Sequence, residues 1–337
     1  MSLNDLWFLL ISVLFVGFFF LEGFDFGVGM SLGILPRSDS EKRMLIRTIG
    51  PFWDANEVWL ITAIGAMFAA FPHWYSTLLS GYYLLFTFIL LGLILRGVAF
   101  EFRNQMSGLV WRKLWDICII IGSCSTPLLI GIIFAGIVQG VPIGSDMNIA
   151  VEGRNLINLY TVWAGVAVLT LCLLHGFVFI SLRTEGNLRE RSNKYALVTL
   201  PITAFFLAGL AFLTSRETDL FSKRGGWLIA AIILGIVVFV LAALFLRKKQ
   251  EKLSFIATSL LVVLTFATLF IGLFPRVMVS SLGSAYDLTI YNAVSSPYTL
   301  KSMTIVAAIF LPFVLGYQCW SYYVFRKRVS EKELLDH

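Results

Sequence analysis

Residues 225–247 read GGWLIAAIILGIVVFVLAALFLR, and only the last of them is charged. A membrane-spanning helix needs about 20 mainly apolar residues, so this stretch is long enough to cross a bilayer. The rest of the chain has the same character. Of its 337 residues, 58% are hydrophobic and 14% are charged, whereas soluble domains carry roughly 25% charged residues. This composition predicts an integral membrane protein, and it excludes intrinsic disorder and nucleic-acid binding.

The chain contains eight more apolar stretches of this kind. They are continuously apolar rather than alternating, which favours helices over the strands of a membrane barrel. The second stretch is the weakest, because it is short and Pro72-His73 turns it almost at once into the third. The nine predicted spans lie near residues 6–34, 54–72, 75–100, 113–138, 156–182, 195–214, 225–247, 254–275 and 302–325.

The positions of the basic residues test this number of spans. Nineteen of the 26 Lys and Arg lie in five alternate connections, at 35–53, 101–113, 183–194, 247–252 and after 325. Basic loops face the cytoplasm. The alternation therefore predicts an all-α protein with the N-terminus outside and the C-terminus in the cytoplasm.

The charged residues in the interiors of these spans are confined to the first four. An ionisable group inside a bilayer costs about 2.5–3.5 kcal/mol on insertion scales, so each one needs a reason. The last five spans contain no Asp, Glu, Lys or Arg in their interiors. The group in the first four comprises Glu22, Asp25, Asp54, Glu57, Arg96, Glu101 and Asp116.

Glu22 and Asp25 are three residues apart, so they share one face of the first predicted helix. Asp25 lies eleven residues before Pro36, or about 16 Å along a helix, which places it inside the membrane. The pair is interpreted either as a site for protons or a polar ligand, or as buried carboxylates that tie helices together.

Asp54 and Glu57 open the second span and allow two interpretations. An N-cap Asp followed by Glu three residues later is typical of a capping box, and the same acids are equally suited to a functional site. Arg96 ends a long apolar run near the cytoplasmic edge. Its side chain either extends to the interface, pairs with an acid such as Asp25, Asp54 or Glu101, or holds a carbonyl of a ligand.

The sequence offers little to bind a metal or a haem. The four cysteines lie in apolar stretches without metal-site spacing. A haem needs an axial His, Met or Cys, yet His73 falls in an external turn, His337 in the tail, and His175 alone in a span. We therefore predict no metal site, and His175 is interpreted as a hydrogen-bonded core residue.

Two stretches of the chain are specific enough to indicate a family. Residues 22–30 read EGFDFGVGM and residues 53–60 read WDANEVWL. They resemble subunit II of the cytochrome bd-type quinol oxidases. The resemblance covers essentially the whole chain, with further matching segments at Gly81-Tyr82-Tyr83, Arg96-Gly97-Val98-Ala99-Phe100-Glu101, 111–116, Gln139-Gly140-Val141-Pro142, 274–275 and 295–300.

The resemblance implies a subunit built from two four-helix bundles and one peripheral helix. Residues 1–150 would form the first bundle, with the acidic cluster. Residues 151–194 would contain the peripheral fifth helix and a cytoplasmic connection. Residues 195–337 would form the second bundle and the basic tail.

The resemblance also implies an activity and partners. The complex would oxidise quinol, reduce oxygen to water and build a proton-motive force across the bacterial cytoplasmic membrane. Haems b and d would belong to subunit I, the expected partner, alongside quinol, lipids and, as an open alternative, a small single-span subunit. No cofactor is firmly expected on this chain, although some family members hold a structural quinone here.

By motif match, Asp25 and Asp54 would be proton-route carboxylates, supported by Glu22 and Glu57. Trp53, Asp54 and Arg96 would line the quinone headgroup region. Two alternatives stay open. One is an ion-coupled secondary transporter that uses Asp25 and Asp54, although no inverted repeat is evident. The other is a scaffold in which the acids only cap and tether helices.

Overall fold

The computed structural model describes residues 2–150 and 156–330. This part of the chain is almost entirely helical, with one two-stranded antiparallel sheet. The helices are α1 (Leu3–Ser31), α2 (Asp39–Ile49), α3 (Trp53–Ala70), α4 (Pro72–Gly81), α5 (Tyr83–Phe102), α6 (Leu109–Gln139), α7 (Leu159–Arg183), α8 (Gly186–Glu217), α9 (Leu220–Arg247), α10 (Glu251–Leu273) and α11 (Pro297–Val324), and the strands are β1 (Arg276–Met278) and β2 (Leu288–Thr289).

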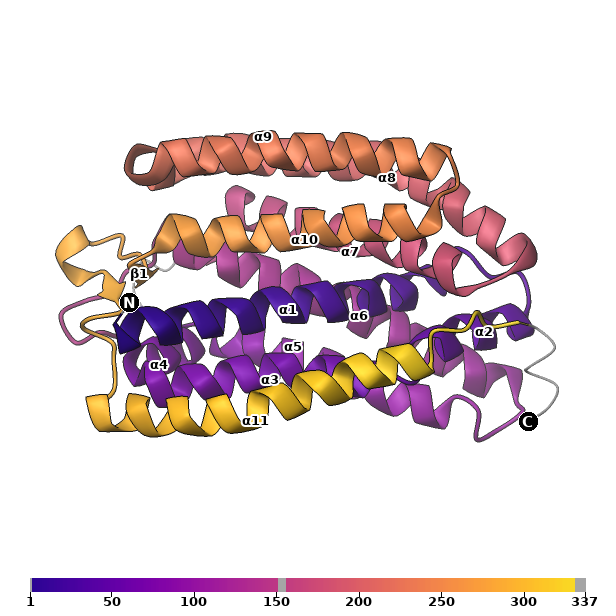
Figure 1. The fold of residues 1–337 in the computed structure, drawn as a ribbon, viewed down its shortest axis with the longest axis horizontal. Coiled ribbons are helices and arrows are strands. Elements are labelled where there is room, and N and C mark those ends of the chain that lie inside the picture. The colour runs from indigo at the N-terminus through magenta and orange to yellow at the C-terminus, as the bar shows by residue number, and fades with distance from the viewer. Residues whose placement is uncertain (1, 151–155, 331–337) are drawn as a thin grey trace.

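Eight of the described helices are long and apolar enough to cross a membrane. They are α1 and α5 to α11, which confirms an all-α membrane protein. The predicted second span, α3, has 18 residues and begins with Asp54, Asn56 and Glu57, which lower its hydropathy. It nevertheless runs beside α1 and α11 (Figure 1) and packs against both.

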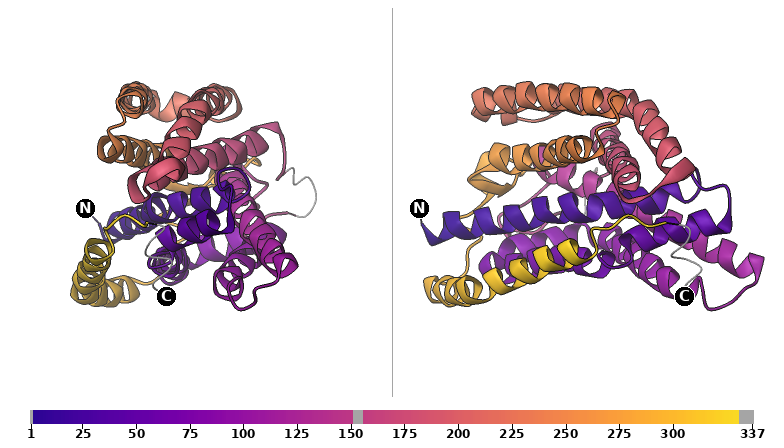
Figure 2. Two further views of the ribbon diagram at one scale, coloured as in Figure 1. Left: turned by 90° about the vertical axis from the view of Figure 1, so that its right-hand side faces the viewer. Right: turned by 45° about the vertical axis from the view of Figure 1, so that its right-hand side comes forward.

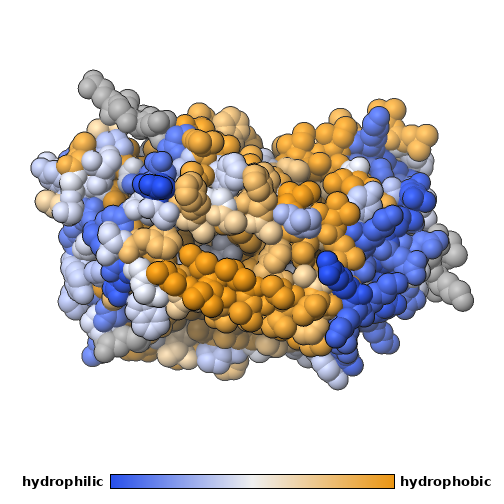
Figure 3. Space-filling model, turned by 90° about the horizontal axis from the view of Figure 1, so that it is seen from above, coloured by the Kyte–Doolittle hydropathy of each residue, from blue (hydrophilic) through white to orange (hydrophobic). Residues whose placement is uncertain are grey.

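The long helices lie side by side along one axis, with α1 in the interior. It contacts α3, α6, α7 and α10. Helices α8 and α9 form an outer layer over α7 and α10, whereas α11 lies on the opposite side of the molecule (Figures 1 and 2). The described basic connections lie at the end of the bundle opposite the N-terminus, where Figure 3 shows a hydrophilic surface.

The fifth predicted span, α7, lies inside the bundle of this chain, whereas the resemblance implies a peripheral helix there. In its most apolar stretch, 78% of α7 is buried, against 6% for α11. Glycines bring α7 close to its neighbours: a Cβ atom on Gly27 of α1 would lie 2.6 Å from the Cα of Gly176, and one on Gly131 of α6 would lie 2.8 Å from that of Gly165. Small residues allow such approaches in membrane bundles. The peripheral helix is the last one.

The predicted third span is divided into two helices. Tyr82, with φ −104° and ψ 24°, separates the short α4 from α5. Tyr82 is fully buried at this break. The membrane span therefore begins at Tyr83 rather than at residue 75.

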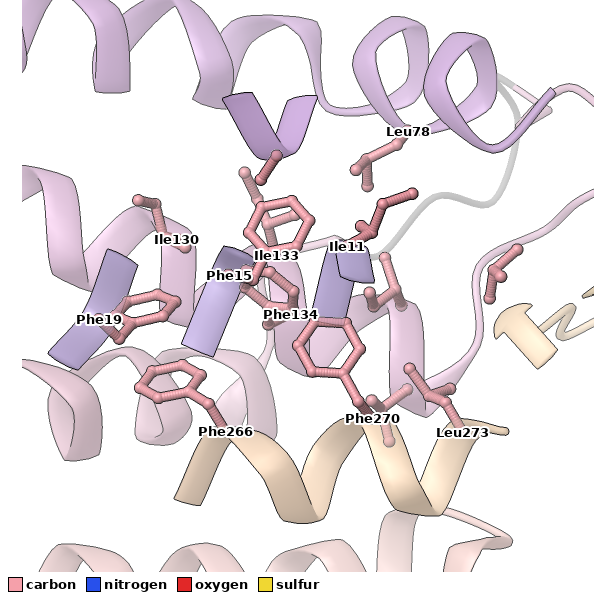
Figure 4. Packing of buried hydrophobic residues seen from close by; sticks show 14 of the residues in the cluster. Ile11, Phe15, Phe19, Leu78, Ile130, Ile133, Phe134, Phe266, Phe270 and Leu273 are labelled. Atoms are coloured by element: carbon pink, nitrogen blue, oxygen red, sulfur yellow. The ribbon is translucent and has the colours of Figure 1, made fainter. Parts of the chain in front are cut away.

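Aromatic side chains fill the space between α1, α6 and α10 (Figure 4). Phe15 lies edge-on to Phe134, with ring centroids 5.2 Å apart, and Phe19 stacks on Phe266. Lipid tails are as apolar as these side chains, so the helices are held by close packing rather than by escape from water.

Two further features cover the ends of the bundle. Helix α2, with Ser38 as its N-cap, lies in the first basic connection. At the other end, the sheet and the segment around Val141 close the bundle: the Val141 N–H donates to the Val279 carbonyl at 3.0 Å, and the Asn4 amide donates to Ile290 at 2.8 Å. The long connection after α10 is thus folded over the helix ends.

Candidate functional site

A buried ion cluster joins three helices of the first half. Arg96 of α5 contacts Glu22 of α1 through Nη2, and the same nitrogen lies 2.7 Å from Oε1 of Glu57 on α3. The Arg96 and Glu22 side chains are fully buried, and that of Glu57 is 16% exposed. The rings of Phe26 and Phe100 lie 4.6 and 5.6 Å from the guanidinium carbon. One cation therefore meets two carboxylates in an apolar setting.

Close packing of α5 on α6 positions Arg96. A Cβ atom on Gly122 would lie 2.3 Å from the Gly92 carbonyl oxygen and 3.1 Å from the Arg96 Cβ. Only glycine fits there, so the two helix backbones meet one turn before Arg96. This contact directs the guanidinium toward α1 and α3.

Asp25 lies beside this cluster and has a different partner. It is fully buried on α1, and the Asn56 amide donates to its Oδ2 at 2.7 Å. The other carboxylate oxygen has no hydrogen-bond partner among the described residues. Asp25 is thus held by a neutral group rather than by a cation.

Asn56 connects Asp25 to the last helix. Its side-chain oxygen accepts hydrogen bonds from the Gln318 amide at 3.1 Å and from the Tyr322 hydroxyl at 2.9 Å. The Tyr322 ring stacks on Phe52, with centroids 4.3 Å apart. A hydrogen-bonded chain therefore runs from the buried Asp25 to the half-buried Tyr322 near the basic end.

Asn56, Gln318 and Tyr322 are absent from the predicted site, because that prediction rests on charged groups within the spans. The available signal was weaker but present. Asn56 lies between Asp54 and Glu57, which are both candidate site residues, and Gln318 is an amide in the mainly apolar last span. Polar but uncharged residues in a span are the ones most easily overlooked.

The structure overturns two interpretations of the second span and of Arg96. Helix α3 begins at Trp53, with Phe52 as N-cap and no capping hydrogen bond from a side chain, so Asp54 and Glu57 do not form a capping box. Arg96 is fully buried and does not extend to the interface, and its carboxylate partners are Glu22 and Glu57 rather than those considered.

Trp53 and Asp54 lie at the edge of the cluster. Trp53 packs on Phe100, with ring centroids 5.4 Å apart, and a Cβ on Gly97 would lie 3.1 Å from the indole. Asp54 is exposed. The structure thus brings Glu22, Glu57 and Arg96 together, and leaves Asp54 on the accessible face of α3.

A second ion cluster lies at the basic end. Asp116 is bound by Arg103 at 2.5 Å and by Lys42 at 2.8 Å, which ties α2 to α5 and α6. Partial burial raises the pKa of the nearby Asp39 carboxyl, but the hydrogen bond and charge of Arg103, aided by Arg112, outweigh it and lower that pKa. Asp116 is therefore a buried residue that ties these helices together.

His175 is a core residue, as expected. Its Nδ1 lies 2.9 Å from the Thr258 hydroxyl, and its ring stacks on Phe255 at 4.9 Å. Within residues 2–150 and 156–330, no group of three or more His, Cys, Asp or Glu is arranged to hold a metal ion.

Comparison with known proteins supplies the family. The model for cytochrome bd terminal oxidase subunit II matches residues 3–325. The chain belongs to this family. It is 53% identical over 332 residues to cytochrome bd ubiquinol oxidase subunit 2 of Bacillus subtilis, and the match covers 98% of each chain. It is 34% identical over 365 residues to cytochrome bd-I ubiquinol oxidase subunit 2 of Escherichia coli K12, covering 98% and 96%.

A solved structure shares the fold. The bd oxidase of Geobacillus thermodenitrificans superimposes with a TM-score of 0.78 at 15% identity, covering 97% of this chain and all of that one. As a bd oxidase subunit II, the chain is part of a membrane-bound quinol:oxygen oxidoreductase. Family membership implies a subunit I partner that carries the haems, and it replaces the transporter interpretation.

Proposed function

We propose that this chain supports the haem-bearing subunit I and supplies part of the route by which cytoplasmic protons reach the oxygen-reducing site. The complex couples quinol oxidation to the reduction of oxygen to water and builds a proton-motive force. The partner's haems supply the oxygen chemistry when bound. The observation that carries the proposal is the buried Asp25, linked through Asn56 to Tyr322.

The route begins at the basic end of the bundle. Tyr322 lies near the C-terminal end of α11, and the exposed Asp54 lies in the first turn of α3. Asn56 joins Tyr322 to Asp25. The unpartnered oxygen of Asp25 is free to take a proton. An amide passes no proton by itself, so Asn56 positions Asp25 while water or Asp54 delivers the proton.

The ion cluster of Glu22, Glu57 and Arg96 holds the proton at the inner end of the route. With all groups charged, Glu22, Glu57 and Arg96 together carry one excess negative charge. One proton makes the cluster neutral and leaves Arg96 paired. A cluster that alternates between these two states holds a proton without ever leaving a lone charge in the membrane interior, where it is costly.

The orientation follows from the positive-inside rule. The N-terminus lies outside, the basic end lies in the cytoplasm, and α3 counts as the ninth span because it runs between α1 and α11. Residues 1–150 then contribute the first four-helix bundle, α7 to α10 form the second in place of residues 195–337, and α11 lies outside both.

Subunit I covers the face formed by α3, α5 and α11. Asp54 is exposed on this face, and an acid there cannot face lipid cheaply. Large apolar side chains of α3 and α11 are exposed as well, with Ile61 69% and Phe313 73% exposed. A protein partner satisfies both the acid and these side chains, and it gives the carboxylates access to the haem site. Whether a small single-span subunit joins the complex stays a separate expectation.

A structural quinone fits this face in part. Trp53 and Asp54 reach the surface of α3 and line the headgroup region. Arg96 has no exposed surface, but its Nε and Nη1 atoms have no partner among the described residues. Arg96 therefore contributes to the quinone region indirectly: its ion pair with Glu57 holds that carboxylate in place behind the headgroup.

The test is the oxygen consumption of the purified complex carrying Asp25→Asn or Asp54→Asn. Both substitutions keep the shape and remove the ionisable group. We expect turnover to fall by about 100-fold, the usual contribution of a positioned proton donor, with normal haem content showing that subunit I is still assembled. Asp146→Asn, at the opposite end of the bundle, is the matched control.

The same variants separate the route from a purely tethering role. If the acids only hold helices together, the variants lower the melting temperature while turnover per assembled complex stays normal. Normal turnover and normal proton uptake in both variants would contradict the proton-route assignment.

A further inference from the structure

A large cavity lies in the second half of the molecule, between α6, α7, α8, α9 and α10. Its volume is about 550 Å³, within the roughly 300–1,000 Å³ of typical ligand pockets. Its wall is apolar apart from one tyrosine and three threonines, and it is rich in small residues such as Ala204, Ala208, Ala211, Ala231 and Gly235. None of the residues assigned to the proton route lines it.

A bend in α8 creates the cavity. Pro201 lies inside this helix, and proline removes a backbone hydrogen bond and kinks a helix. The fully buried positions of α8 are Leu188, Ser192, Ala196, Thr199 and Thr203, and none of the described positions after Thr203 is fully buried. Beyond the bend, α8 therefore runs alongside the core without closing onto it.

Aromatic side chains of α7 hold the outer part of α8 in place. The Trp163 indole donates to the Phe206 carbonyl at 2.9 Å and fills the space beside Gly209. The hydroxyls of Tyr160 and Thr214 lie 3.2 Å apart. Specific contacts therefore hold one wall of the cavity in place, which argues against a loosely packed region.

The polar groups of the wall are already engaged. Thr265 and Thr268 donate to carbonyls of their own helix at 2.8 and 2.6 Å, and Tyr160 and Thr214 pair with each other. A buried water needs two to four polar partners. The wall therefore favours a purely apolar occupant over water or a polar molecule.

The cavity opens to the lipid-facing surface. Seen from the side of α8 and α9, the apolar surface has a hollow near its middle (Figure 3). The side chains around it are exposed and apolar, with Ile236 59% and Val240 50% exposed. In a membrane, the medium outside this opening is lipid hydrocarbon.

We propose that this cavity binds one acyl chain of an anionic membrane phospholipid. With about 30 Å³ per water-sized group, it has room for roughly 18 such groups, which suits a single long hydrocarbon chain. At the end of α9 that carries Lys223 and Arg224, the lining residues Leu220 and Phe221 lie next in sequence to these cations. Lys223 forms an ion pair with Asp219, with Nζ 2.7 Å from Oδ2, and its side chain is 47% exposed. An ammonium group has three donors, so the remaining ones are available to the lipid phosphate.

The test uses the complete oxidase complex, purified in a mild detergent and examined by native mass spectrometry with lipid extraction. We expect the wild type to retain one phosphatidylglycerol more than the cavity-filled variant Ala208→Leu/Gly235→Leu. A Cβ atom on Gly235 meets nothing within 4 Å, so the new side chain enters open space. Added phosphatidylglycerol should raise the melting temperature of delipidated wild type but not that of the variant.

The matched control is Gly226→Leu/Ala230→Leu. It makes the same two kinds of exchange, Gly to Leu and Ala to Leu, at exposed positions of α9. It should retain the lipid. Lys223→Gln keeps the cavity intact and should reduce retention of phosphatidylglycerol relative to phosphatidylethanolamine, which provides a second test if the filled variant fails to fold. Equal lipid retention in the wild type and the filled variant, or a retained quinone in place of the phospholipid, would overturn the proposal.

Discussion

The two halves of this subunit are built from similar apolar helices but are filled in opposite ways. Between α1, α3, α5 and α11, the interior holds an arginine, three carboxylates and an amide. Among the described residues of α6 to α10, the interior holds aromatic rings, an apolar cavity and the hydrogen-bonded pair of His175 and Thr258. In a membrane, apolar packing is available everywhere, so the few polar side chains single out the half in which we propose the proton route.

The largest expected effect is in the polar half. Arg96→Leu leaves Glu22 buried without its cation, and removing one partner of a buried ion pair costs about 3–5 kcal/mol. We expect a strongly lowered melting temperature of the complex, measured by thermal unfolding. The exposed Arg216→Leu should change it little. Equal melting temperatures for both variants would show that the ion cluster does not hold the helices together.

The corresponding change in the apolar half is Phe266→Ala. It removes the ring stacked on Phe19, and a Phe→Ala change in a core costs about 3–5 kcal/mol. We expect a lower melting temperature but unchanged turnover per assembled complex, measured as oxygen consumption per haem. The exposed Phe212→Ala is the control. A fully assembled Phe266→Ala complex with reduced turnover would break the division between the two halves.

A smaller effect is expected for Asn56→Leu, which leaves Asp25 ionisable but unpositioned. Misplacing a reacting group typically costs one to two orders of magnitude, and we expect about a tenfold loss of turnover with normal haem content. Combined with Asp25→Asn, it should add nothing further, because the two side chains act as one unit. Additive losses in the double variant would separate Asn56 from Asp25.

The smallest effect concerns the loop end of the apolar half. Burial raises the pKa of Asp219, but hydrogen bonds from Arg276 and Lys223 outweigh it and lower that pKa to about 2. The pKa of Asp219 is thus lower in the folded state than its ordinary value of about 3.9. The ionised carboxylate therefore stabilises the folded state at pH values above about 3.9, and this contribution is lost as the pH falls toward 2.

Asp219→Asn should therefore destabilise the complex at neutral pH by less than about 1 kcal/mol, since the pair is partly exposed. The difference in melting temperature between variant and wild type should shrink as the pH falls from about 4 to about 2. A difference that stays constant across this range would mean that the carboxylate charge is unimportant there.

The membrane spans can be predicted from the sequence, because each one is a long run of apolar residues. The way in which the spans pack against one another cannot be predicted in this way. Helices α7 and α11 are similarly apolar, so hydropathy gives no sign that one is central and the other peripheral. The contact of Gly27 with Gly176 decides the matter, and it depends on which faces of two distant helices meet.

The site shows the same limit. Glu22, Asp25, Glu57 and Arg96 stand out because charges are costly in a membrane. Which acid Arg96 binds cannot be predicted, because several acids lie at similar depth and only the rotation of each helix selects among them. Neutral amides carry a smaller penalty, and Asn56 was overlooked for that reason.

Helix α11 lies on the outside of the bundle, yet Gln318 and Tyr322 complete the surroundings of Asn56. It is also translated after every other described helix. Until it docks, Asp25 has no organised connection to the cytoplasmic end. Under the proton route proposed above, a subunit whose α11 has not docked lacks the polar path, so the growing chain would not leak protons before its assembly is complete.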